Sequence, residues 1–82
     1  MDAQIKKFVE EKIGGIMGLR QYFLPALLEL DLTDQQIYLF FRRASAERIR
    51  LWIKISEWLS AEKLKASKDN VKWYIKKILK IN

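Results

Sequence analysis

Residues 45–60 read SAERIRLWIKISEWLS and form the most strongly apolar helical pattern of the chain. On a helical projection of ~100° per residue, the large apolar side chains of this stretch cover an arc of about 220°. They are Leu51, Trp58, Ile55, Leu59, Trp52, Ile49 and Ile53. A surface helix of a globular protein usually has an apolar stripe only a little over ~100° wide. The pattern therefore predicts a central apolar helix over 46–60, with other helices packed on two or three of its sides.

The composition of the whole chain favours an all-α protein. Half of the 82 residues are hydrophobic, and there are only one proline and three glycines. Helix-forming residues are abundant, and a chain of this length makes one domain, 1–82. We expect a small bundle of four or five helices, near 3–23, 34–44, 46–60 and 68–80, with a short helix after Pro25.

Short polar motifs mark the expected starts of four helices. Asp2 precedes the first helix and Ser67 precedes the last, and both side chains can accept hydrogen bonds from free backbone N–H groups. Thr33 and Gln36 have the spacing of a capping box. Ser45 is expected to start the central helix in the same way.

Glycines interrupt the first helical pattern at Gly14, Gly15 and Gly18. Two interpretations fit this segment: one long helix over 3–23 that kinks at Pro25, or two helices joined by a GGIMG loop. The apolar phase continues through the glycines, which favours the long helix. Gly14 and Gly18 are four residues apart and would let another backbone approach closely. A loop or a plain packing notch is favoured over a helix-dimerisation motif, whose spacing rule belongs to apolar membrane helices.

Basic residues are concentrated in the C-terminal half of the chain. Residues 1–41 hold four basic and six acidic residues, whereas 42–82 hold twelve basic and four acidic ones, and the net charge is +6. The last helix, 68–80, is amphipathic, with apolar side chains on one face and lysines on the other. The candidate nucleic-acid-binding residues are Lys68, Lys72, Trp73, Lys76, Lys77 and Lys80.

A lysine face binds phosphates through charge and reads no base sequence. A tryptophan among the lysines, Trp73, could stack on a base of single-stranded nucleic acid. The same helix could instead lie on an anionic membrane surface, or its lysines could simply be solvated. We favour a non-catalytic nucleic-acid-binding regulatory or accessory factor, with a membrane-surface protein and a dimeric protein–protein adaptor as alternatives.

Catalytic functions are disfavoured because the chain has no cysteine and no histidine. It therefore lacks the usual proton shuttle at neutral pH, a thiolate nucleophile and soft metal ligands. We expect no enzymatic activity, no cofactor, no metal site and no small-molecule substrate. The N-terminus does not resemble a signal peptide and no apolar run is long enough to span a bilayer, so we expect a cytoplasmic protein.

Three large side chains fall outside the apolar stripes of their helices or at the edge of them. They are Leu39, Trp58 and Trp73. Several large apolar side chains on the outer sides of helices suggest a contact with another molecule. The sequence thus predicts a homodimer, with Leu39 and Trp58 at a two-fold interface.

Overall fold

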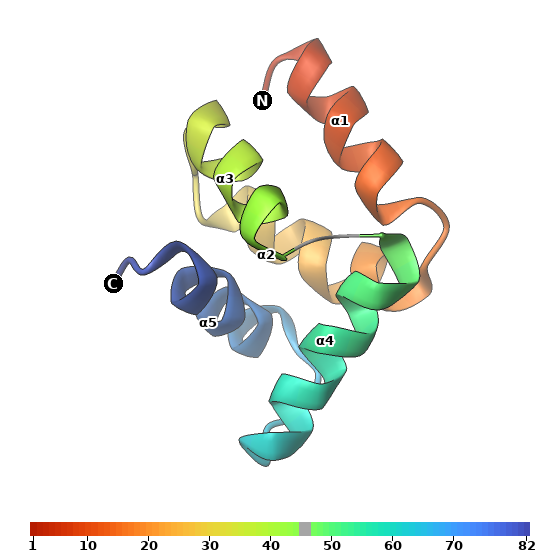
Figure 1. Ribbon diagram of the computed structural model, residues 1–82, viewed down its shortest axis with the longest axis vertical. Coiled ribbons are helices and arrows are strands. Elements are labelled where there is room, and N and C mark those ends of the chain that lie inside the picture. The colour runs from red at the N-terminus through yellow and green to blue at the C-terminus, as the bar shows by residue number, and fades with distance from the viewer. Residues whose placement is uncertain (45–46) are drawn as a thin grey trace.

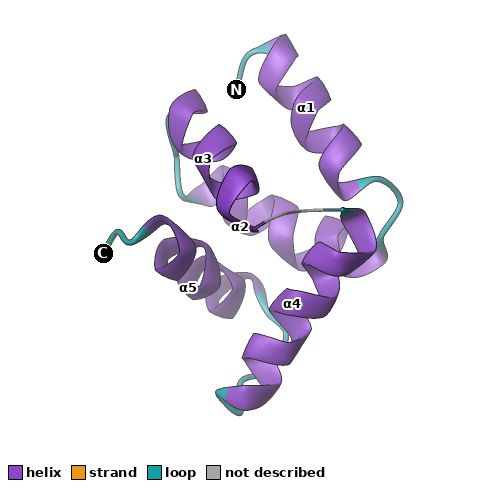
Figure 2. Cartoon of the chain, in the orientation of Figure 1, coloured by secondary structure: helices purple, strands orange, loops and turns teal. Residues whose placement is uncertain are grey.

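The computed structural model describes residues 1–44 and 47–82, which form helices joined by short connections (Figure 1). The elements are α1 (Ala3–Ile13), the π-helical segment η1 (Leu19–Phe23), α2 (Leu24–Glu29), α3 (Asp34–Ala44), α4 (Arg48–Ala61) and α5 (Lys68–Leu79). The described residues contain no strand, and Figure 2 shows only helices and loops. The predicted small all-α bundle is confirmed.

Side-chain caps confirm three of the four predicted helix starts. Asp2 Oδ1 accepts a hydrogen bond from the backbone of α1 at 2.9 Å, and Ser67 Oγ accepts one from the backbone of α5 at 3.1 Å. Thr33 and Gln36 form the reciprocal capping box, with backbone-to-side-chain bonds of 3.1 and 2.9 Å. Ser45, the fourth predicted start, lies outside the described residues. The predicted helix start at residue 46 is wrong, however, because Glu47 is extended and α4 begins at Arg48.

A cluster of aromatic rings lies at the centre of the core. The ring of Phe40 has its centroid 5.4 Å from that of Phe23, 5.3 Å from that of Phe41 and 6.3 Å from that of Tyr74. These separations are typical of favourable aromatic pairs. The four rings come from η1, α3 and α5, and α5 also packs against α2 and α4. The C-terminal helix is therefore the element that ties the bundle together.

The predicted enclosure of the apolar helix on two or three sides is not observed. α4 buries Leu51, Ile55 and Leu59, whereas Ile49 and Ile53 are 64% and 47% exposed. The helix lies at the edge of the bundle in Figure 1. Its apolar arc is wider than its buried face because the described chain has no further element to cover the outer side.

The predicted long helix over 3–23 is wrong, because α1 ends at Ile13 and the chain turns there. Gly14 has a φ of 52°, in the left-handed region that favours glycine. Arg20 Nε donates to the Gly14 carbonyl at 2.7 Å, and Arg48 Nε donates to the Glu11 carbonyl at 3.0 Å. Two arginines thus satisfy carbonyl groups that the end of α1 leaves free.

The regular helix is also interrupted just before Pro25, where the sequence predicts a kink. The Leu24 N–H donates to the carbonyl of Leu19, five residues earlier, which is the hydrogen bond of a π turn. In a regular α-helix the Pro25 ring would clash with the carbonyl four residues earlier. The π turn therefore ends next to Pro25, which lies in the first turn of α2, and α2 continues to Glu29.

Candidate nucleic-acid interface

The outward side of α5 carries a tryptophan surrounded by lysines. α5 turns Val71, Tyr74, Ile75 and Leu79 into the core, so the opposite side of the helix faces solvent. Trp73 is 62% exposed there. Lys77 and Lys80 are exposed and Lys76 is half-buried. We call these four residues, Trp73, Lys76, Lys77 and Lys80, the Trp73 face.

Lys68 and Lys72, which the sequence also assigns to the binding surface, both pair with Glu29 of α2. Each ammonium nitrogen lies 2.6 Å from a carboxylate oxygen of Glu29. The hydrogen bonds from Lys68 and then from Lys72 lower the pKa of Glu29 to about 2. These two lysines therefore join α5 to α2, and a phosphate would compete with Glu29 for their charge.

An acid titration should reveal the contribution of the Glu29 pairs to stability. The pKa of Glu29 falls from its ordinary value of 4.5 to about 2 in the folded chain. The pairs are therefore fully stabilising above about pH 4.5, and this contribution is lost as the pH falls toward 2. We expect Glu29→Gln to lose less thermal stability than the native chain between these two pH values. Equal losses would show that the pairs contribute nothing measurable.

Two arginines of α3, Arg42 and Arg43, were not assigned to the site from the sequence, and Arg43 extends the basic surface. Both are exposed at the end of α3. Arg43 Nη1 donates to the Ile78 carbonyl at 2.9 Å, so α3 brings a guanidinium to the last turn of α5. The signal in the sequence was a pair of arginines in the last turn of a predicted helix. The proximity of Arg43 to α5 depends on packing and had no local signal.

The last turn of α5 ends in a left-handed residue and a closing backbone hydrogen bond. Lys80 adopts a left-handed conformation with a φ of 58° and ends the helix, one residue earlier than predicted. The Ile81 N–H then donates back to the Lys76 carbonyl at 3.0 Å. This closing turn satisfies carbonyls that the helix end would otherwise leave free.

The two residues predicted at a dimer interface are largely covered within one chain. Leu39 and Trp58 are half-buried and pack against the core. The Trp58 ring meets the Tyr74 ring edge to face at 5.6 Å, and its buried Nε1 has no hydrogen-bond partner among the described residues. An interface through Leu39 and Trp58 stays a prediction, with less free apolar surface than the sequence suggested.

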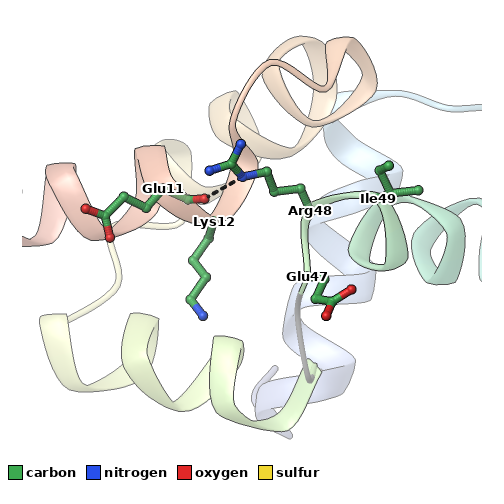
Figure 3. Close-up of a pocket in the computed structure, with 5 residues that line it drawn as sticks. All are labelled: Glu11, Lys12, Glu47, Arg48 and Ile49. Carbon is green, nitrogen blue, oxygen red and sulfur yellow. Dashed lines mark hydrogen bonds between the residues drawn. The ribbon is translucent and has the colours of Figure 1, made fainter.

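A hollow of about 390 Å³ lies between the end of α1 and the start of α4 (Figure 3). It is lined by Glu11, Lys12, Glu47, Arg48 and Ile49. The Arg48 side chain reaches across the hollow and donates to the Glu11 carbonyl. The main role of Arg48 is therefore to join α1 to α4. Within 1–44 and 47–82, no group of three histidine, cysteine or acidic residues is placed to hold a metal ion.

Comparisons with known proteins add no constraint on the function. No protein-family model, curated protein or solved structure matches the chain. None of the helices in the described parts of the chain combines the length and apolar character that crossing a bilayer requires. The function is therefore inferred from α5 and its surroundings.

Proposed function

We propose that this protein is a non-catalytic, cytoplasmic nucleic-acid-binding accessory factor with regulatory character, and that its Trp73 face contacts single-stranded nucleic acid. The observation that carries the proposal is the 62% exposure of Trp73 between lysines on the outward side of α5. A free aromatic ring beside several cations is the combination that single-strand-binding proteins use, with stacking on bases and attraction to the backbone.

Each kind of side chain on the face has a separate task. Lys76, Lys77 and Lys80 neutralise phosphates, which gives affinity without selecting a base sequence. Trp73 stacks on one base, a contact worth roughly 1–3 kcal/mol that any base can make. Arg43 of α3 lies beside the last turn of α5 and extends the positive surface toward α3.

The burial of α5 supports this proposal over a membrane-surface role. An interfacial helix inserts a continuous apolar face between lipid headgroups. In this chain Val71, Ile75 and Leu79 of that face are buried in the core. Outside that buried face, the exposed large apolar residues of this segment are Trp73 on the helix and Ile81 just after it. Two separate side chains among lysines suit base stacking better than insertion into a membrane.

Binding across a salt series tests the phosphate contacts. If Lys76, Lys77 and Lys80 each neutralise one phosphate, the log–log slope of affinity against salt should be about −2 for a single strand. Lys77→Gln with Lys80→Gln should flatten it to about −0.7, since one contact remains. The matched control is Lys6→Gln with Lys7→Gln, which removes the same charge from the exposed side of α1. Affinity that is insensitive to salt would contradict the proposal.

Substitution of Trp73 separates stacking from general attraction. Trp73→Ala should weaken single-strand binding by roughly 5- to 150-fold, while Trp73→Phe keeps much of the affinity because it preserves a ring. Binding to a duplex of the same sequence should change little, since its bases are already stacked. Anionic vesicles are measured in parallel. Loss of vesicle binding, with no effect on single strands, would favour the membrane-surface alternative.

A further inference from the structure

The outer side of α4 carries two exposed isoleucines that the Trp73 face does not include, in a strip continued by serines. Ile49 and Ile53 are 64% and 47% exposed and lie one helical turn apart. Ser56, half-buried, and Ser60, exposed, continue the strip toward the end of the helix. We call these four residues the α4 strip. A hollow of about 530 Å³ lies between its two isoleucines and the neighbouring charged residues, lined by Glu47, Ile49, Arg50, Ile53, Lys54 and Glu57.

Two opposite charges lie along one edge of this strip. On a helical projection Arg50 and Glu57 point within about 20° of each other, to the same side of Ile53. Both are exposed. No ion pair within the described chain includes either of them. Lys54, by contrast, is already used, since its ammonium donates to the Ala44 carbonyl at 3.1 Å.

We propose that the α4 strip binds a second copy of this chain, with the two α4 helices antiparallel and the two-fold axis passing near Ile53. Arg50 precedes Ile53 by three residues and Glu57 follows it by four, so they lie about 4.5 and 6 Å from the axis along the helix. The axis therefore brings Arg50 opposite the partner's Glu57, and Glu57 opposite the partner's Arg50. Ile53 meets its own copy between these two pairs.

The position of the charges selects the antiparallel arrangement. When two antiparallel helices pack, the same edge of each helix comes together, whereas parallel helices bring opposite edges together. Arg50 and Glu57 share one edge, and the other edge holds Ser56 and the half-buried Trp52. Only the antiparallel pair forms both ion pairs, and the small side chain of Ser56 lets the helices approach closely.

The size of the strip sets the expected strength of the dimer. A stable interface usually buries about 800 Å² on each partner, and two partly exposed isoleucines with a charged edge provide less than that. The dissociation constant should be on the order of 10–100 µM. This inference does not depend on nucleic-acid binding, because its test uses the protein alone.

Sedimentation equilibrium of the full chain at increasing concentration tests the dimer. The apparent mass should rise from the 9.8 kDa of one chain toward twice that value. Arg50→Glu and Glu57→Arg should each raise the dissociation constant at least tenfold, because each places two like-charge pairs in the dimer. The matched control for Arg50→Glu is Lys7→Glu, which makes the same charge change on the exposed side of α1. Circular dichroism confirms that all variants are folded.

The most specific test of the antiparallel arrangement is an equimolar mixture of the two charge-reversal variants, Arg50→Glu and Glu57→Arg. In the mixed dimer both contacts again join opposite charges, so association should return to the native strength. A further variant, Ile53→Asp, should abolish association by placing two charges near the axis. A chain that stays monomeric, a mixture that fails to associate, or association that survives Ile53→Asp would each overturn the antiparallel α4 dimer.

Discussion

Replacing Phe40 with alanine should destabilise the fold by about 3–5 kcal/mol, the usual cost of truncating a buried aromatic residue. Phe40 is fully buried, and its ring lies among those of Phe23, Phe41 and Tyr74. The neighbouring rings come from three different elements and cannot all move inward to fill the space. A domain of this length is stabilised by only about 4–12 kcal/mol. Urea unfolding followed by circular dichroism should therefore show a variant near the limit of folding.

Trp73→Ala is the matched comparison, because it removes a larger ring from the surface. Trp73 is 62% exposed, so its loss should change the free energy of unfolding by less than about 0.5 kcal/mol. The same variant should lose affinity for single strands. A cost close to that of Phe40→Ala would show that Trp73 supports the fold, and the stacking proposal would then be wrong.

Helix starts could be predicted from the sequence because their causes are local. The capping box joins Thr33 and Gln36, which are three residues apart in the sequence. The side chains of Asp2 and Ser67 also cap backbone N–H groups three residues later. A side chain and the backbone it caps are neighbours in the sequence. No information about packing is needed to recognise them.

The break at Gly14 and the edge position of α4 depend on distant residues. The turn at Gly14 is held by Arg20, and Arg48 donates to the same end of α1 from another helix. An unbroken apolar phase cannot show that such contacts exist. In the same way, the apolar arc of α4 shows how much that helix could bury, but not whether a neighbour reaches Ile49 and Ile53.

The exposed residues of the candidate site could be predicted wherever the phase of the helix decides which side chains face outward. The phase of the last helix places Trp73, Lys77 and Lys80 outward, and the structure finds them exposed. The pairing of Lys72 with Glu29 spans 43 residues and has no local signal. Nucleic-acid binding by the Trp73 face stays a prediction.

A close contact at Gly18 should make this position very sensitive to substitution. Gly18 has ordinary helical angles, φ −61° and ψ −37°, so the backbone itself would accept alanine. However, a Cβ added there would overlap the six-membered ring of Trp52. That ring stacks on Tyr22, with centroids 6.0 Å apart and planes 13° apart, which limits its freedom to move. Gly18 is therefore the packing notch that the sequence suggested, and Trp52 is what fills it.

Gly18→Ala should lower the free energy of unfolding by about 2 kcal/mol. Alanine has the better helix propensity, but forcing a methyl group into a packed site destabilises the fold by more than that gain. Gly15→Ala is the matched control. A Cβ at Gly15 has nothing within 4 Å, and that variant should be neutral or slightly stabilised. Adding Trp52→Leu to Gly18→Ala should cost less than the sum of the two single changes, since the ring that clashes is gone. Strictly additive costs in urea unfolding would show that Trp52 and Gly18 are not in contact.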